Sequence, residues 1–508
     1  MDRRESRRRF LKVAGAMGLG AVMSGWTRAA ERGERPNVVL IMTDQQSADA
    51  MSCRMGKQFL NTPAMDRLTA NGMLFTRAYS ASPLCQPLRN SLFTGMYPHQ
   101  TGVTTNVGKA VSLDPKDFVC MGTYFKNAGY ETAYSGKWHL QYDLNDPGAH
   151  GFEILKNRSN DNIDAKTTDA AVKFLARKHD RPFLLVASFT NPHNVCQWAR
   201  RLAGRDDELS CGEIGTPPAL DQLPPIPGNF APPKNEPDGM TVIRKGYHFE
   251  GGLFPVGKFT EADWRKQRWG YYRMIEKVDA EIGKVLEALR QTGQEDNTLI
   301  VFTSDHGDCA GAHNFNQKTV LYEESVRVPL IVVWKGKVAA GTSDKLVNTG
   351  IDILPTLLDA AGLETPRKLT GLSLLPLAFG KSPASWRDYV VVQNNMTQTG
   401  PVEELGFAPT MEGRMVRTER YKYCVYSRGV HRESLVDLQA DPGEMNDLAT
   451  EEKYREVLHA HRKLLAQFGR VHKDSLVAEL LADDVKPMPF TAADGLKAKR
   501  SRAAGGDN

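Results

Sequence analysis

Five short strand-like runs, separated by helix-like patterns, most constrain how this chain can fold. They are short and rich in β-branched or aromatic residues, which favours buried strands. Helical periodicity is typical of the segments between them, and strands that alternate with helices predict an α/β fold. We therefore expect a doubly wound, largely parallel sheet flanked by helices. The five runs cover residues 38–42, 131–134, 183–189, 299–302 and 330–334.

The clearest helix pattern covers residues 261–290. Thr260 can cap its N-terminus, and Asp263 lies at the third helical position, as in a capping box. Apolar residues recur at 3.6-residue spacing, so one face of this helix should pack on the sheet. They are Ile275, Val278, Ile282, Val285, Leu286 and Leu289.

Polar clusters directly follow four of the predicted strands. The carboxyl ends of parallel strands meet at one edge of such a sheet, and ligands bind there. A single polar cluster after a strand is usual for a solvated loop, but four such clusters at one edge of the sheet, the rim, predict an active site. The clusters are Thr43-Asp44-Gln45-Gln46, Gly136-Lys137-Trp138-His139, Asn191-Pro192-His193 and Ser304-Asp305-His306-Gly307-Asp308.

The pattern of predicted secondary structure changes after Trp386. Short β-rich pieces and a helix pattern at 451–468 predict a small C-terminal α+β domain over 386–473, following a catalytic domain over 35–385. Residues 474–508 should form a poorly ordered tail. A helix is expected from Asp352 to Gly362 with Pro355 in its first turn. The stretch 216–239 contains eight prolines, which indicates a surface loop near the rim or a plain insertion.

The net charge of +5 resides entirely in residues 1–29, which contain seven basic and two acidic residues. The remaining chain has no net charge, so we expect no basic surface of the kind that binds nucleic acid. Ser6-Arg7-Arg8-Arg9-Phe10-Leu11-Lys12 is a twin-arginine pattern, and a short apolar stretch and small residues follow it. Residues 1–30 are therefore predicted to be an export signal, which places the mature chain in the periplasm or outside the cell. A charged N-terminal helix or an uncleaved anchor is the alternative.

The mature chain is expected to contain no stable membrane span, because the apolar stretch 13–23 is shorter than the ~20 residues that a spanning helix needs. An apolar fraction of 41% and a charged fraction of 25% are ordinary for a globular protein. The seven cysteines show no CxxC or other metal-like spacing, so at least one is unpaired and no disulfide pairing is predicted.

One cysteine lies in the pentapeptide Cys85-Gln86-Pro87-Leu88-Arg89, which Asn90-Ser-Leu-Phe-Thr-Gly95 follows. This C-x-P-x-R pattern resembles the signature of the type I sulfatases of the alkaline-phosphatase superfamily. The polar clusters described above, the block from Lys318 to Pro329 and the motif at 437–448 are similar to further blocks of that family in the same order. The resemblance extends over nearly the whole mature chain and implies an alkaline-phosphatase-like fold.

The resemblance also implies the cofactors. In that family the cysteine is oxidised to Cα-formylglycine, so Cys85 would be the nucleophile precursor and a formylglycine-generating enzyme a partner. Asp44, Gln45, Asp305 and His306 would bind a divalent metal, expected to be Ca²⁺ with Mg²⁺ as the alternative. Many relatives carry Asp at the position of Gln45, so this site has one negative charge fewer.

The remaining roles follow from sulfate ester chemistry. Positive charge must surround the sulfate, and Arg89, Lys137, Lys318 and the metal would supply it. One hydroxyl of hydrated formylglycine would attack sulfur, and the other would lose its proton to His139 and expel sulfate. His193 or Lys318 would protonate the leaving oxygen, and the sequence does not separate them. The list of pocket candidates also includes His313, with a surface role as the alternative.

The sequence thus predicts an exported, arylsulfatase-like sulfuric ester hydrolase that acts on a sulfated carbohydrate or a similar small organic sulfate. A phosphodiesterase or phosphonate monoester hydrolase of the same superfamily is one alternative, since these enzymes share the pentapeptide and a similar metal site. A catalytically dead glycan-binding scaffold is the other. The sugar, the sulfated position, the metal and the oligomeric state are not predicted.

Overall fold

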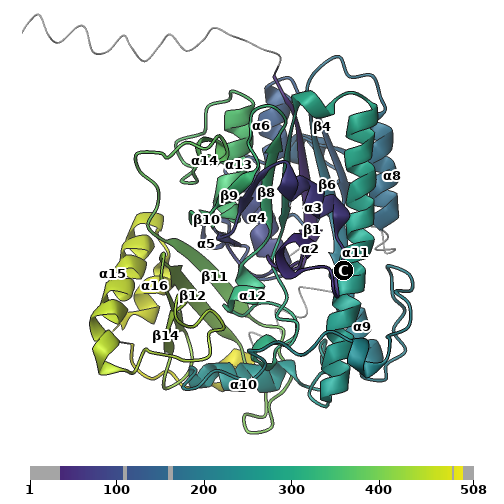
Figure 1. Cartoon of the computed structure of the whole chain (residues 1–508). Helices are drawn as coiled ribbons and strands as arrows, with labels where there is room; N and C mark the ends of the chain where they lie inside the picture. The colour runs from purple at the N-terminus through teal and green to yellow at the C-terminus, as the bar shows by residue number, and fades with distance from the viewer. Residues whose placement is uncertain (1–34, 107–110, 158–163, 483–484, 496–508) are drawn as a thin grey trace, which may run out of the picture. The chain divides into compact units, whose positions relative to one another are not determined.

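An eight-stranded sheet forms the centre of the computed structural model, which describes residues 35–106, 111–157, 164–482 and 485–495 (Figure 1). The predicted export signal lies outside the described residues. The strand order is β5-β4-β6-β1-β7-β8-β2-β9. In chain order the strands are β1 (Asn37–Asp44), β2 (Met73–Phe75), β4 (Glu131–Gly136), β5 (Glu153–Asn157), β6 (Phe183–Pro192), β7 (Thr298–Ser304), β8 (Leu330–Trp334) and β9 (Gly341–Ser343).

Most neighbouring strands of this sheet run parallel. β1 pairs in parallel with both β6 and β7, and β4 pairs in parallel with β5 and β6. β8 runs antiparallel to β7 and to β2. The prediction of a largely parallel α/β sheet is therefore confirmed, and the carboxyl ends of β1, β4, β6 and β7 lie at one edge.

Helices cover both faces of the sheet (Figure 1). One face packs against α3 (Pro63–Ala70), α8 (Asp164–Leu175) and α11 (Glu261–Gln291), and the other against α4 (Cys85–Thr94), α6 (Met121–Asn127) and α13 (Thr349–Ala360). Alternate residues of β1 enter the two cores, Val38 and Leu40 on one side and Val39 and Ile41 on the other. Strands buried on both faces have few polar residues, as the apolar runs predicted.

Shorter elements connect these layers, and two of them, β3 and β10, pair in parallel. They are α2 (Ser52–Met55), β3 (Ala78–Tyr79), α5 (Pro98–Thr101), α7 (Pro147–His150), α9 (Val195–Leu202), α10 (Asp238–Tyr247), α12 (Glu323–Val326), β10 (Val347–Asn348) and α14 (Leu375–Ala378), with 3₁₀ turns at Leu220–Gln222, Glu295–Asn297, Ala312–Asn314 and Glu452–Tyr454.

A second, antiparallel sheet follows in the C-terminal part of the chain. Its order is β11-β12-β13-β14, and one of its faces packs against α15 and α16. The α+β character expected for this part is thus present. The elements are β11 (Val390–Met396), β12 (Met411–Arg417), β13 (Tyr421–Tyr426), β14 (Glu433–Asp437), α15 (Arg455–His472) and α16 (Ser475–Leu480).

Two local predictions were wrong. Helix α13 begins at Thr349, because the Asn348 side chain accepts a hydrogen bond from the Gly350 amide, so Pro355 lies inside the helix and not in its first turn. Residues 475–480 were expected in a poorly ordered tail but form α16. Val477 and Leu480 are buried there, because two apolar residues at i, i+3 spacing face α15 and the sheet.

Within the described ranges, no helix is both long and apolar enough to cross a membrane.

Candidate active site

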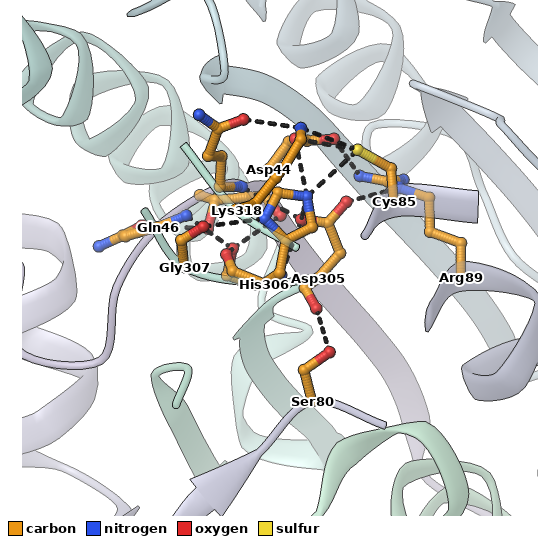
Figure 2. Close-up of polar contacts among 12 residues, drawn as sticks. Asp44, Gln46, Ser80, Cys85, Arg89, Asp305, His306, Gly307 and Lys318 are labelled. Atoms are coloured by element: carbon orange, nitrogen blue, oxygen red, sulfur yellow. Dashed lines mark hydrogen bonds and ion pairs between the residues drawn. The ribbon is translucent and has the colours of Figure 1, made fainter. Parts of the chain in front are cut away.

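The four polar clusters predicted from the sequence meet at one edge of the large sheet, and Figure 2 shows residues of the two that follow β1 and β7. Asp44 is the last residue of β1, Lys137 directly follows β4, His193 directly follows β6, and Asp305 directly follows β7. The parallel pairing of these strands brings their ends together, as expected for ligand sites in open α/β sheets.

Cys85 begins helix α4, and its side chain lies among these strand ends. Leu84 before it is extended, and Pro87 falls in the first turn, where a missing N–H costs nothing. The Gln86 amide donates to Asn106 Oδ1 at 3.3 Å. The positive end of the helix dipole therefore lies beside the Cys85 side chain and favours negative charge there.

Two ammonium groups and the ring of His306 surround the Cys85 sulfur. It lies 3.3 Å from Lys318 Nζ, 3.7 Å from Lys137 Nζ and 3.2 Å from His306 Nε2. Burial opposes ionisation of the thiol, but the charges of Lys137 and Lys318 outweigh burial and hold its pKa well below the usual range. The site is therefore built to stabilise an anion at the position of the residue-85 side chain.

A buried ion-pair network fixes the walls of the site. The Arg89 guanidinium donates to Asp305 Oδ2 at 2.9 Å and to Asp44 Oδ2 at 3.2 Å, and Lys137 pairs with the same Asp44 oxygen. Arg89 also donates to Ser188 Oγ at 2.8 Å, a contact that no sequence motif signalled. Because these side chains are buried, the network holds their geometry without competition from water.

The other oxygens of Asp44 and Asp305 face a ring nitrogen of His306. His306 Nδ1 lies 2.9 Å from the Gly307 carbonyl and donates to it, which leaves the lone pair on Nε2. This nitrogen is 3.8 Å from Asp44 Oδ1 and 3.5 Å from Asp305 Oδ1. Burial and the charge of Asp44 raise the pKa of Asp305 to about 6. One potential ligand atom from each of these residues and from Cys85 lies within 4.8 Å of the others. Two carboxylates that repel each other and a nearby ring nitrogen together fit a divalent cation.

Gln45 lies beside this cluster in a left-handed backbone conformation, with φ of 74°. Its backbone amide donates to Asp305 Oδ1 at 3.1 Å, and its side-chain oxygen accepts from Lys318 Nζ at 2.7 Å. Its side-chain nitrogen donates to Asp308 Oδ2 at 2.6 Å and to Gln317 Oε1 at 3.0 Å. The Gln45 oxygen that was predicted to bind the metal therefore accepts a hydrogen bond from Lys318. Asp308 was not predicted as a site residue, although it ends the polar cluster after β7.

The two predicted catalytic histidines both face the Cys85 side chain. Burial lowers the pKa of His139 to about 4 and that of His193 to about 3, and for His193 the charges of Lys318 and Lys137 add to this effect. His139 has φ of 53°, and its buried Nδ1 has no hydrogen-bond partner among the residues that the structure describes. Both imidazoles are therefore neutral at neutral pH.

His313 is fully buried but lies in a different cluster, so the surface role considered for it does not apply. Its ring stacks on Tyr322 with a centroid separation of 3.8 Å, and Nε2 is 3.5 Å from Glu324 Oε2. The proline-rich stretch reaches this cluster, because the Asn229 carbonyl accepts from the His313 amide at 2.7 Å and its side chain donates to Glu324.

Two family models match this chain. The model described as Sulfatase matches residues 36–363, and the model described as N-sulphoglucosamine sulphohydrolase, C-terminal, matches residues 311–470. The first match contains the strand ends, the pentapeptide and Lys318.

Characterised relatives cover most of the chain. A Delta 4,5-hexuronate-2-O-sulfatase of Bacteroides thetaiotaomicron is 30% identical over 88% of this chain and 91% of its own length. An N-acetylglucosamine-6-O-sulfatase of the same species is 28% identical over 88% of each chain. The solved structure of a 2-O GAG sulfatase superposes with a TM-score of 0.75 at 30% identity, over 87% of this chain and 94% of the other.

The phosphonate monoester hydrolase of Agrobacterium radiobacter has a similar fold. It superposes with a TM-score of 0.68 at 23% identity, over 86% of this chain and 96% of its own. At that identity the likeness shows the fold alone.

Proposed function

This chain belongs to the sulfatase family of sulfuric ester hydrolases, and from that premise we propose that it removes a sulfate group from a sulfated glycosaminoglycan sugar by way of a formylglycine at residue 85. One observation carries the proposal: Lys137 and Lys318 approach the residue-85 side chain at the N-terminus of α4. Positive charge at the point where sulfate oxygens would gather is what hydrolysis of a sulfate ester needs.

The residue-85 side chain would hold the nucleophile. Formylglycine in its hydrated form supplies two hydroxyl groups, one that attacks sulfur and one that later allows sulfate to leave. The ion pair of Arg89 with Asp305 holds the guanidinium in place, and Lys137 pairs with Asp44 beside it. These cations hold the ester in line with residue 85 and balance the charge on its oxygens.

Asp44, Asp305 and His306 would hold a divalent cation, and the ligand role of Gln45 stays part of this proposal. When bound, such an ion supplies positive charge to the sulfate oxygens and lowers the pKa of a nearby hydroxyl group. Carboxylate oxygens favour Ca²⁺ or Mg²⁺, whereas imidazole is an unusual ligand for either, so this assignment rests on the family. The second carboxylate oxygens remain with Arg89 and Lys137, so these residues orient the ligands.

Two proton transfers are assigned to the chain's own residues. His139 is neutral and faces residue 85, so its imidazole can accept the proton that must leave the second hydroxyl. Burial works against the charge of Lys318, but the neighbouring Cys85 and Asp44 raise its pKa above the usual range, so it carries a proton. His193 is neutral in the free enzyme and would assist the leaving oxygen once an anionic sulfate raises its pKa.

The substrate class comes from the relatives. The two sulfatases named above act on a 2-O-sulfated hexuronate and a 6-O-sulfated N-acetylglucosamine, both sugars of glycosaminoglycan type. A desulfation screen over mono- and disaccharides with sulfate at single defined positions tests this proposal. We expect free sulfate from one or a few of these sugars, whereas hydrolysis of aryl phosphodiesters alone would contradict it.

We also propose that the chain is exported through the twin-arginine pathway and matured by a formylglycine-generating enzyme. The supporting observations are the Ser6–Lys12 pattern and the position of Cys85 as the first residue of helix α4. Replacing Arg7 and Arg8 by Lys should leave the protein in the cytoplasmic fraction. Export that persists unchanged would contradict the assignment.

A further inference from the structure

The backbone that carries His193 departs from the regular ladder of the sheet. Met42 of β1 pairs with Ser188 of β6, but the next pair is Asp44 with Pro192. Three residues of β6, 189–191, therefore lie opposite the single residue Thr43. On the other side, the pairing of β4 with β6 ends at Ser188. Bulges of this kind re-aim the side chains that follow them, and here the next side chain is His193.

A bulge leaves backbone amides without ladder partners, and a buried carboxylate supplies them here. Asp164, the first residue of α8, accepts from the Thr190 amide at 2.7 Å and from the Asn191 amide at 3.0 Å. It also accepts from Asn191 Nδ2 at 2.7 Å. The His193 amide then donates to the Thr190 carbonyl at 3.0 Å, which closes the turn.

We propose that Asp164 is a positioning residue that fixes the bulge in β6 and thereby the His193 imidazole in the active site. The inference rests on the proposed function, in which His193 assists departure of the leaving oxygen. Asp164 and Asn191 are both at least 94% buried, so no water replaces these hydrogen bonds. The three bonds lie two and three residues before His193, whereas Asp164 makes no hydrogen bond or ion pair with Cys85 or the proposed metal ligands among the described residues.

Asp279 offers a matched control. It is also buried and accepts from two backbone amides, those of Ala64 and Met65, at 3.0 and 2.9 Å. Those amides begin helix α3, away from the strand ends that form the site. Asp164→Asn and Asp279→Asn therefore remove the same kind of interaction, and only the first should disturb His193.

The test compares two substrates in mature, metal-loaded enzyme. A nitrophenyl sulfate has a good leaving group and needs little assistance, whereas a sulfated sugar has a poor one. Asp164→Asn should lose at least about tenfold more rate on the sugar than on the nitrophenyl ester. Asp279→Asn should change both rates by the same factor. Equal losses on both substrates in Asp164→Asn, or no loss, would overturn the proposal.

Hydrogen–deuterium exchange provides a readout that does not depend on catalysis. The amides of Thr190 and Asn191 should exchange faster in Asp164→Asn and be unchanged in Asp279→Asn; protection that remains would overturn the proposal. Should Asp164→Asn fail to fold, Asn191→Ala serves in its place, because it removes one of the three bonds. It should also lose more rate on the sulfated sugar than on the nitrophenyl ester. Equal losses on the two substrates would count against the proposal. A wild-type enzyme that desulfates no substrate would instead contradict the proposed function.

Discussion

The ammonium group of Lys318 lies 3.3 Å from the sulfur of Cys85, although 233 positions separate the two residues in the chain. Lys318 is held there by a second contact, the hydrogen bond that its ammonium group donates to Gln45 Oε1. Both contacts of the ammonium group are buried, and charge–charge interactions are strongest where water is excluded. Lys318 thus acts on whatever group residue 85 carries.

Removal of this charge should lower activity without a comparable loss of stability. We expect Lys318→Met to reduce kcat/KM by about 10² to 10³, the usual effect of losing one preorganised charge at an anionic transition state. Lys245→Met is the control, because Lys245 is exposed and pairs with Glu404 on the surface. Steady-state rates on the best substrate of the screen provide the measurement, and equal rates in the two variants would exclude an electrostatic role.

Metal removal tests the role of the strand-end carboxylates. Chelation should abolish activity, and added Ca²⁺ or Mg²⁺ should restore it. Asp305→Asn should cost on the order of 10² to 10⁴ in rate. Asp352 is the matched control, because it is also buried in a pair with an arginine, Arg387. Asp352→Asn should lose stability but keep its metal dependence, and full activity of metal-free enzyme would refute the metal site.

The two histidines should fail at different steps. His139→Ala should release a burst of alcohol and then turn over slowly, because the step that needs a proton acceptor comes second. His193→Ala should slow alcohol release itself, and less so for a nitrophenyl ester than for a sugar. Stopped-flow measurement of alcohol release distinguishes these patterns. Identical kinetics without a burst in either variant would mean that the roles are misassigned.

Stability should depend on pH through buried carboxylates such as Asp279. Burial raises its pKa to about 6, although hydrogen bonds from two amides oppose the rise. A carboxyl group whose folded-state pKa is raised stabilises the fold only while it is protonated, so its contribution is lost as pH rises from about 4 through 6. Wild type should thus lose about 2–3 kcal/mol relative to Asp279→Asn between pH 4 and pH 7.5. Denaturant titrations at both pH values measure this, and a constant difference would contradict it.

The sequence predicted the positions of the site residues better than the contacts that hold them in place. Asp44, Lys137, His193 and Asp305 could be placed because each lies at the carboxyl end of a predicted strand, and parallel strands bring such positions together. Cys85 and Lys318 were placed by resemblance, since neither follows a strand of the large sheet.

The supporting contacts could not be predicted, because they depend on pairing register and side-chain packing. The bulge in β6 that engages Asp164 is set by register against β1, which no periodicity encodes. The engagement of Gln45 by Lys318 and Asp308 depends on how three loops pack. Helix α16 was missed because its six residues give too short a pattern to distinguish from a loop.

The central claim is that residue 85 acts as formylglycine. Mass analysis of the peptide that contains residue 85, taken from protein that releases sulfate, tests this claim most directly. We predict a peptide lighter than the encoded one by the difference between a cysteine thiol and an aldehyde, and no sulfate release from Cys85→Ala. Active protein whose peptide carries only unmodified Cys85 would contradict the account.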